Sequence, residues 1–422
     1  MTGSSPAPSI ASTPSIRSEI GPLEAVLLHR PGDELTRITP TNKDELLFDE
    51  LLWLEHARLE HDAFADLLRG AGVEVLYVEE LLAEVVADPQ LAREVVDRHV
   101  TETTCGPQAV GRIRDLLLAS SPMDLAEHLI AGVTLEEVGP IDGLVAAATA
   151  PTELLLGPLP NLVFTRDSSA WIGEGVVLSP MHRPVRRRET DLLRTVYREH
   201  PRFADAPMWF GDRPEDLYPA TFEGGDLLVV GERGLAIGLS ERTTPSGVET
   251  LAARLFAADV VDRILAVDLP KVRAAMHLDT IVTQVDIDTF ITYPKMTATL
   301  RTFQITRGAS AADVVPGTSG SVHVTAGGDL ASGLAWAAGL GRVRAIEPDL
   351  GSIRAEREQW NDANNTLALA PGVVVAYERN VATNEILQGA GIQVHTIPSY
   401  ELPRGRGGPR CMSCPITRGV VA

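Results

Sequence analysis

A strand–turn–strand pattern recurs four times after residue 150 of this 422-residue chain, and it constrains the fold more than any other feature. Each copy has an apolar run, a turn marked by glycine, proline or aspartate, and a second apolar run, which is typical of a β-hairpin. Similar hairpins at intervals of tens of residues predict internal pseudo-repeats, as in a propeller, whereas a doubly wound sheet alternates single strands with helices. The predicted hairpins are Ala170–Ser179, Leu227–Leu239, Thr280–Tyr293 and Leu367–Tyr377.

The chain before residue 150 divides into regions of different character. Residues 1–17 are rich in Ser, Pro and Ala and predict a disordered tail. Residues 23–30 and 73–78 predict strands, joined by an amphipathic helix that Thr41 caps and that ends at Gly70. Residues 79–148 lack strand patterns and predict several short helices. We therefore expect one α/β domain formed by residues 18–78 and 149–422, with a helical subdomain, 79–148, inserted in it.

The composition excludes several classes of protein. The chain has 37 Lys and Arg against 57 Asp and Glu, a net charge of −20, so nucleic-acid binding would need a strong local basic patch. The most apolar stretch, Gly143–Pro160, is interrupted by Glu153 and three prolines, so no membrane span is expected. Three cysteines cannot form a disulfide framework, and no secretion signal precedes them. We therefore expect a cytoplasmic protein without nucleic-acid or membrane partners.

Polar and reactive residues stand immediately before each predicted hairpin. Each has an ordinary explanation by itself, because Asp often forms turns, a buried His is usually structural, and paired glycines serve tight backbone geometry. If the hairpins are equivalent units, however, these residues meet around one axis and share a pocket. They are Asn161, Arg166, Asp167, Glu223, Asp226, His277, Asp279, Asn364 and Asn365.

The C-terminal segment carries a second candidate, a thiol preceded by arginines and glycines. Arg404, Arg406 and Arg410 precede Cys411, and neighbouring cations favour the reactive thiolate form. The glycines let the backbone approach a substrate closely, or close over it. Three other interpretations stay open: a redox pair of Cys411 with Cys414, half of a zinc site, and a basic tail that contacts a partner.

Other arginines are candidates for binding an anion. The run Arg183–Arg188 stands out against the acidic background, and Arg242 follows the second hairpin. Most charge runs are solvated faces, but Arg forms bidentate hydrogen bonds with a carboxylate. The chain lacks the glycine motifs of nucleotide-binding loops, so no nucleotide cofactor is indicated.

Five motifs of this chain resemble those of arginine deiminase and follow the family's order, over about Ser18 to Arg418. The resemblance implies the fold of the guanidine-modifying enzymes, a pentein-like, five-bladed α/β propeller of ββαβ units with an inserted helical subdomain. It also implies hydrolysis of L-arginine to L-citrulline and ammonia in arginine catabolism, without metal or cofactor. The motifs are Asn161–Asp167, Phe222–Asp226, Met276–Asp279, Glu358–Asn365 and Gly407–Met412.

The resemblance also implies roles for nine residues. Cys411 matches the nucleophile, and Glu223 and His277 match the acid/base pair. Asp167 and Asp279 match the carboxylates that hold the guanidinium. The remaining four are Asn161, Arg186 and Arg242, which match the groups that hold the α-carboxylate, and Arg406, which matches the mobile-loop arginine.

Some features limit this interpretation. Arg410 stands where some members have His before the nucleophile, which leaves the pH optimum open, and Cys414 matches no catalytic role. A non-catalytic guanidine-binding protein on this scaffold would be expected to lose the nucleophile or the histidine, which this chain keeps. An agmatine-type deiminase would have no need of Arg186 and Arg242, because agmatine has no α-carboxylate. We also expect a homo-oligomer.

Overall fold

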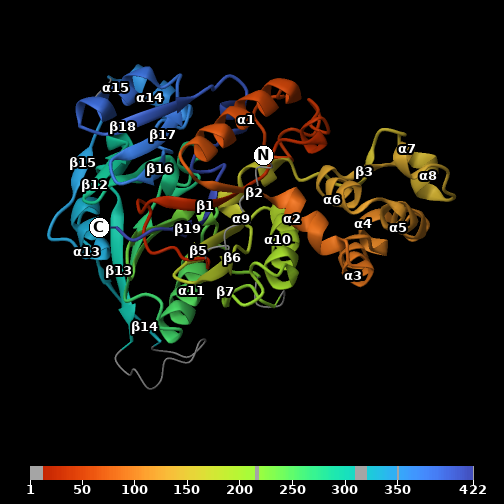
Figure 1. Cartoon of the computed structure of the whole chain (residues 1–422), viewed down its shortest axis with the longest axis horizontal. Helices are drawn as coiled ribbons and strands as arrows, with labels where there is room; N and C mark the ends of the chain where they lie inside the picture. The colour runs from red at the N-terminus through yellow and green to blue at the C-terminus, as the bar shows by residue number, and fades with distance from the viewer. Residues whose placement is uncertain (1–12, 214–217, 309–320, 349–350, 422) are drawn as a thin grey trace, which may run out of the picture.

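The computed structural model describes residues 13–213, 218–308, 321–348 and 351–421. They form a mixed α/β fold in which helices lie around the periphery of several small sheets (Figure 1). The predicted α/β class is confirmed.

All four predicted hairpins are present as antiparallel strand pairs. Their strands are almost entirely buried on both faces, which explains why the apolar runs are nearly continuous. The pairs are β5 (Ser169–Ile172) with β6 (Gly175–Leu178), β8 (Leu227–Gly231) with β9 (Gly234–Leu239), β11 (Val282–Asp286) with β12 (Thr289–Thr292), and β16 (Leu367–Ala370) with β17 (Val373–Tyr377).

The second strand of each hairpin also pairs in parallel with a strand further along the chain. Each unit is therefore an antiparallel hairpin followed by a crossover and a parallel strand, which is the ββαβ pattern. The third strands are β7 (Met208–Phe210), β10 (Arg263–Asp268), β15 (Arg344–Ile346) and β18 (Gln393–Ile397).

The two ends of the chain build a further sheet of the same kind. β1 (Leu23–Leu28) pairs antiparallel with β19 (Cys414–Arg418) and parallel with β2 (Glu74–Tyr77). Five sheets of the described residues thus share the ββαβ pattern. β13 (Arg301–Arg307) and β14 (Val322–Ala326) extend the sheet of β8–β10, and β3 (Val133–Thr134) pairs with β4 (Leu154–Leu156).

Helices form most of the crossovers and bury an apolar face against the sheets. In α10, for example, Leu192, Leu193 and Val196 are fully buried, at the spacing of one helix face. The crossover helices are α1 (Leu54–Gly70), α10 (Arg187–Glu199), α11 (Pro245–Ala257), α13 (Leu330–Ala338) and α15 (Val381–Gly389), with a shorter α12 (Pro294–Thr297). α9 (Thr165–Ser168) precedes the first hairpin, and α14 (Ser352–Trp360) precedes the fourth.

A group of helices projects from one side of the molecule (Figure 1). It joins the main body where α2 packs on α10 and on β2. The group is α2 (Val78–Val86), α3 (Pro89–His99), α4 (Glu102–Cys105), α5 (Val110–Ala119), α6 (Pro122–Ala131), α7 (Leu135–Val138) and α8 (Leu144–Ala148). That residues 79–148 form a separate subdomain stays a prediction.

Two local predictions near the N-terminus are wrong. The helix expected from Thr41 begins only at Leu54, because the carbonyl oxygens of Leu46 and Leu47 accept hydrogen bonds from Asn161 and Arg273 instead of continuing a helix. Leu47 also has a φ of 67°, which no helix contains.

The predicted tail also ends earlier than expected. Residues 1–12 of that tail lie outside the described residues, but Ser15 and Ile16 form β-bridges with Thr417 and Gly173. The ordered chain therefore starts before residue 18.

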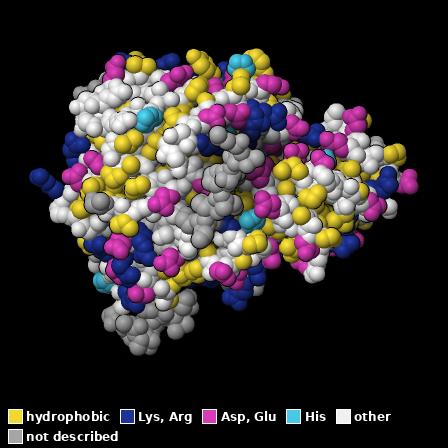
Figure 2. Space-filling model, viewed as in Figure 1, with side chains coloured by type: hydrophobic (Ala, Val, Ile, Leu, Met, Phe, Trp, Pro, Cys, Tyr) yellow, Lys and Arg dark blue, Asp and Glu magenta, His cyan; other side chains and the backbone are white. Residues whose placement is uncertain are grey.

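Two surface features bear on possible partners. Among the described residues, no helix is both long and apolar enough to cross a bilayer. On the face shown in Figure 2, Lys and Arg side chains are interspersed with Asp and Glu and do not gather in one basic patch. That the protein lacks nucleic-acid partners stays a prediction.

Candidate active site

Short turns immediately ahead of three hairpins position the chemically reactive side chains. Pro160–Val163 and α9 precede β5, Gly224–Asp226 precedes β8, and Leu278–Thr280 precedes β11. The turn Gly224–Asp226 contacts both α9 and the turn Leu278–Thr280. Segments more than a hundred residues apart therefore meet, as the equivalence of the hairpins predicts.

Gly225 makes this close approach possible. A Cβ atom at this position would lie 2.6 Å from Nδ1 of His277 and 2.8 Å from Oδ1 of Asp167, closer than side chains allow. The glycine pair in the predicted Glu223–Asp226 motif thus leaves the space that lets the imidazole and the carboxylate face each other.

The meeting point is a small cavity. Its free space is about 20 Å³, which holds roughly one water molecule. Seven of the nine predicted residues line it: Asn161, Asp167, Arg186, Arg242, His277, Arg406 and Cys411. The other two are in contact with these, because Glu223 bonds to His277 and Asp279 bonds to Cys411.

Cys411 lies deep in the site as a protonated thiol. Its Sγ is 3.8 Å from Oδ2 of Asp279, and its backbone N–H donates to Oδ1 of Asn365 at 3.0 Å. Burial raises the pKa of Cys411 well above its usual value, and the negative charges of Asp279 and Asp167 raise it further. The thiol therefore needs a nearby positive charge before it becomes a nucleophile.

His277 is held between two carboxylates. Its Nε2 is 2.8 Å from Oε2 of Glu223, and its Nδ1 is 3.5 Å from Oδ1 of Asp167. Burial lowers the pKa of His277, but Asp167 and Glu223 more than offset this and raise the pKa to about 9. The ring is therefore an imidazolium at neutral pH, ready to give up a proton.

Cations keep Glu223 ionised beside this histidine. Burial raises the pKa of Glu223, but Arg242 and His277 bring the pKa well below its usual range. Nη1 of Arg242 donates to Oε2 of Glu223 at 3.3 Å. Glu223 therefore stays a carboxylate and fixes the orientation of the imidazolium.

Asp167 and Asp279 each have one oxygen occupied by an arginine and one oxygen left over. Arg186 donates to Oδ2 of Asp167 at 2.6 Å, and Arg410 donates to Oδ2 of Asp279 at 2.7 Å. Oδ1 of both residues is buried and accepts no hydrogen bond from any described residue. Because buried acceptors normally have partners, these two oxygens mark where donors of a bound ligand fit.

Arg186 and Asn161 are tied into the wall of the cavity. Nε of Arg186 donates to Oε1 of Glu189 at 3.0 Å, and its Nη2 donates to the carbonyl oxygen of Asn161 at 3.1 Å. Nδ2 of Asn161 donates to the Leu46 carbonyl oxygen at 2.8 Å. That these groups hold an α-carboxylate stays a prediction, although the structure brings them to the site.

Arg406 closes the cavity on one side. Its guanidinium carbon lies 3.6 Å from the centre of the Trp360 ring, and none of its guanidinium nitrogens has a hydrogen-bond partner in the described part of the chain. Its φ of 64° is a left-handed conformation that a residue other than glycine adopts only at a cost. Arg406 is therefore buried but weakly held.

The family model of arginine deiminase matches residues 44–418 of this chain. The chain belongs to the arginine deiminase family.

Solved structures of similar fold include two chains of comparable length. The N-terminal domain of ArgZ, an arginine dihydrolase from the ornithine–ammonia cycle in cyanobacteria, was solved with product and is 14% identical, with a TM-score of 0.54 over 94% of this chain and 99% of that one. SxtG from Microseira wollei, an amidinotransferase in the saxitoxin biosynthetic pathway, is 14% identical, with a TM-score of 0.55 over 97% and 99%.

A third similar structure is that of a longer protein. A mutant of AgrE in complex with L-arginine is 16% identical, with a TM-score of 0.52 over 94% of this chain and 40% of that one. The chain thus spans about 40% of the length of the AgrE chain. At these identities the three structures show a shared fold.

The site of this arginine deiminase family member contains residues that sequence reasoning missed. Glu189 holds Arg186, and Glu19 holds Arg410. Asp362, two residues after Trp360 in the motif Glu358–Asn365, is 3% exposed with neither carboxylate oxygen bonded to a described residue, and burial raises its pKa to about 7. Only Asp362 had a sequence signal, its place in that motif.

The alternative interpretations of the cysteines find no support in the site. All three cysteines are free thiols, and Cys414 lies in β19 with its Sγ 3.6 Å from the carbonyl oxygen of Ser169. Cys105 lies in α4, among the projecting helices. Cys411 and Cys414 are therefore separate thiols in different surroundings, Cys411 beside Asp279 and Cys414 beside Ser169.

One group of side chains in the site has the spacing of a metal site. Ligand atoms of Asp167, Glu223 and His277 lie within 4.8 Å of one another. The same carboxylates already accept hydrogen bonds from Arg186 and Arg242, so a metal ion would have to displace or oppose two guanidinium groups. That the site works without metal stays a prediction.

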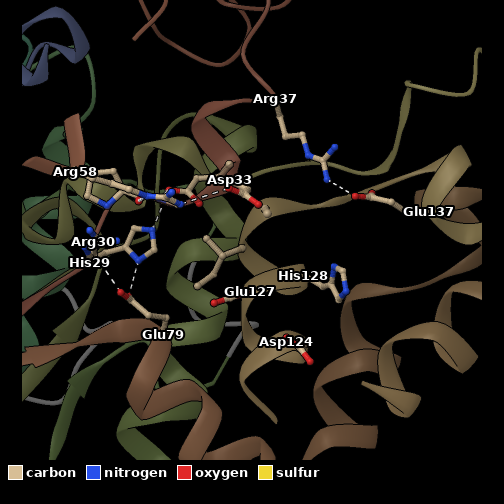
Figure 3. A pocket seen from close by; sticks show the side chains of 15 residues that line it. His29, Arg30, Asp33, Arg37, Arg58, Glu79, Asp124, Glu127, His128 and Glu137 are labelled. Carbon is tan, nitrogen blue, oxygen red and sulfur yellow. Dashed lines mark hydrogen bonds and ion pairs between the residues drawn. The ribbon is translucent and has the colours of Figure 1, made fainter. Parts of the chain in front are cut away.

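A second cavity, of about 240 Å³, lies outside this site (Figure 3). His29 at the end of β1 and Glu79 of α2 face it, together with Glu127 and His128 of α6. His29 bonds through Nδ1 to Glu79 at 2.7 Å and through Nε2 to Glu34 at 3.1 Å. This second histidine is also held between two carboxylates.

Proposed function

We propose that this chain hydrolyses L-arginine to L-citrulline and ammonia through a covalent intermediate on Cys411. The observation that carries the proposal is the convergence of one thiol, one imidazolium and two half-satisfied carboxylates on a single buried cavity. These are the groups that a guanidinium, a poor electrophile, needs in order to react. Family membership supports the same conclusion.

Binding would exchange internal ion pairs for pairs with the substrate. The guanidinium of L-arginine would donate to the unpartnered Oδ1 atoms of Asp167 and Asp279. As the guanidinium takes over Asp167, Arg186 would become available to the α-carboxylate, together with Arg242 and Asn161. The substrate carries opposite charges at its two ends, so both halves of the exchange keep charges paired.

The bound cation would also activate the nucleophile. A positive guanidinium beside Cys411 opposes the negative charges of Asp279 and Asp167 that raise the thiol pKa. The thiol proton passes to solvent before the site closes, and the thiolate then attacks the guanidinium carbon and gives a neutral tetrahedral adduct.

His277 would then act twice. First the imidazolium protonates one amino group of the adduct, ammonia leaves, and a positively charged thiouronium remains on Cys411. The now neutral imidazole takes a proton from water, and the hydroxide adds to the thiouronium carbon. Collapse of this second adduct breaks the C–S bond and releases citrulline, and the hydroxyl proton leaves with ammonia as ammonium.

Substrate entry requires a movement of the Arg406 segment. A cavity of about 20 Å³ cannot hold an amino acid. The Arg406 guanidinium has no hydrogen bond to a described residue, and its stacking on Trp360 is its closest contact, while the backbone N–H of Arg406 donates to the Pro403 carbonyl oxygen at 3.1 Å. We therefore propose that the Arg406 segment opens for the substrate and closes over it.

The proposal also includes the arrangement of the sheets, the cellular location and the oligomeric state. The five sheets of ββαβ pattern would be the blades of a five-bladed propeller that closes around the site. The protein would act in the cytoplasm, where its free thiols stay reduced. It would also form a homo-oligomer.

Product analysis tests the proposed reaction. Incubation with L-arginine should yield citrulline and ammonia in equal amounts, with no ornithine and no dependence on an added amine acceptor. Agmatine should react poorly, because it lacks the carboxylate. The Cys411→Ala variant should bind L-arginine without turnover. Ornithine as the main product, or full activity of the Cys411→Ala variant, would contradict the proposal.

A further inference from the structure

Arg410, the residue before the nucleophile, is the largest fully buried side chain of the described residues. Its guanidinium bridges two acids. Nη1 donates to Oδ2 of Asp279 at 2.7 Å, while Nε and Nη2 donate to the two carboxylate oxygens of Glu19 at 3.0 and 3.1 Å. Nη2 also donates to the Leu227 carbonyl oxygen at 2.7 Å. Four hydrogen bonds thus fix the orientation of the Arg410 guanidinium.

Glu19 comes from a part of the chain that no motif pointed to. It precedes β1 and lies ahead of residues 44–418, where the family model matches. It is 8% exposed, and its Oε1 also accepts from the backbone N–H of Val229 at 3.1 Å. The bridges at Ser15 and Ile16 anchor the segment that carries it.

Glu19 is ionised in this setting. Burial raises its pKa, but Arg410 and then Arg166 offset this and lower the pKa to about 2. The pair is therefore a bidentate carboxylate–guanidinium contact away from solvent, which fixes direction as well as charge.

We propose that Glu19 is a positioning residue of the candidate active site, acting through Arg410 on the carboxylate of Asp279. The inference rests on the proposed function. Arg410 is the charged donor to Oδ2 of Asp279, and at 2.7 Å it lies closer than the Cys411 thiol at 3.8 Å, so its orientation decides where the unpartnered Oδ1 lies. Without Glu19, Arg410 keeps its charge but loses two of its directed bonds, and Asp279 loses a fixed partner.

A purely structural role for the pair makes a different prediction. In that case loss of Glu19 lowers the stability of the protein and affects all ligands of the folded enzyme alike. A positioning role affects a ligand that needs the Asp279 carboxylate more than a ligand that does not. L-arginine carries a guanidinium cation and L-citrulline a neutral ureido group of similar shape, so the two ligands separate the cases.

The experiment measures binding of both ligands by calorimetry, in the Cys411→Ala background that prevents turnover. Glu19→Gln should weaken L-arginine about tenfold and L-citrulline less than about twofold. Glu34→Gln is the matched control, because Glu34 is also a buried partner of a cation, His29, and should leave both affinities unchanged. Equal weakening of both ligands by Glu19→Gln, no weakening of either, or the same selective loss in the control would overturn the proposal.

Two additions keep the result interpretable. If Glu19→Gln does not fold, Arg410→Lys replaces it, because one ammonium cannot span Glu19 and Asp279 and the same selective loss is expected. Turnover of the parent enzyme is measured separately. A parent that makes no citrulline contradicts the proposed function, whereas an active parent whose Glu19 variants show no selectivity contradicts only this inference.

Discussion

The protein contains two buried histidines that are each held between two carboxylates, yet only one has the surroundings of a reaction site. His29 has both ring nitrogens in hydrogen bonds, one to Glu79 (Figure 3) and one to Glu34. His277 has one close bond, to Glu223, while its second nitrogen is 3.5 Å from an Asp167 oxygen that has no hydrogen bond to the described residues. Satisfied polar groups stabilise a fold, whereas unsatisfied ones leave capacity for a ligand.

The two clusters also differ in what surrounds them. Arg186 and Arg242 pair with the carboxylates beside His277, and a thiol and a glycine lie against the same cavity. Around His29 the arginines have acidic partners of their own, such as Arg30 with Asp62. A raised histidine pKa, to about 9 and about 10 in the two clusters, therefore does not by itself identify a catalytic group.

The largest expected difference between the clusters is in turnover. His277→Asn should lower kcat for L-arginine by roughly 10²–10⁴-fold, because it removes the proton donor and acceptor of both steps. His29→Asn should leave kcat of the folded enzyme within about twofold. Steady-state kinetics of both variants check this, and comparable losses of kcat in the two would remove the distinction drawn here.

The arginines beside the clusters sharpen the comparison further. Arg186→Ala should cost about 2–4 kcal/mol in kcat/KM for L-arginine, because a buried charge-assisted pair is lost. Arg30→Ala, beside His29, is the matched control and should change kcat/KM little, since its pair with Asp62 is half exposed. Unchanged arginine kinetics in the Arg186 variant would contradict its role.

The free energy of unfolding should depend on pH through the cluster around His29. Burial lowers the pKa of His29, but Glu79 and Glu34 raise it from 6.5 to about 10. A raised pKa adds stability that is complete below about pH 6.5 and is lost as the pH rises towards 10. His29→Gln should therefore lower the free energy of unfolding by about 3 kcal/mol near pH 6.

The measurement is chemical denaturation of both proteins across this pH range. The difference between wild type and His29→Gln should shrink as the pH rises towards 10. A constant difference would show that His29 does not carry the charge.

The smallest expected effect is on the pH profile of the reaction. Once L-arginine is bound and the thiol has lost its proton, His277 must be an imidazolium, and Asp167 and Glu223 raise its pKa to about 9, so kcat should fall by about tenfold per pH unit above that value. In His29→Asn the same limb should remain in place. If the alkaline limb of the pH profile shifts in the His29→Asn variant, the limb reports the titration of His29 and not that of His277.

The sequence predicted more of the site than of the connections that support it. The four hairpins and the residues ahead of them were readable because apolar periodicity and turn residues are local signals. The pairing of β1 with β19 was not readable, because register between strands almost 400 residues apart leaves no local pattern. Glu19 was missed for the same reason, because 391 residues separate it from Arg410. Glu189 lies only three residues from Arg186, and it was missed because a buried acid partner of an arginine has no sequence signature.

Helix propensity also gave a wrong prediction in a segment that contacts the cavity. The stretch after Thr41 has the pattern of a helix, but Leu46 and Leu47 give their carbonyl oxygens to Asn161 and Arg273 and form turns instead. Tertiary contacts at the cavity therefore outweigh helix propensity in this segment.

Mass spectrometry of the acid-quenched reaction tests the central claim most directly. If Cys411 attacks the guanidinium carbon, the peptide that contains Cys411 should carry the mass of arginine less ammonia during turnover. His277→Asn should accumulate this adduct or form none, but never release citrulline at the normal rate. Citrulline production with Cys411 unmodified throughout, or an adduct on Cys105 or Cys414 alone, would contradict the account.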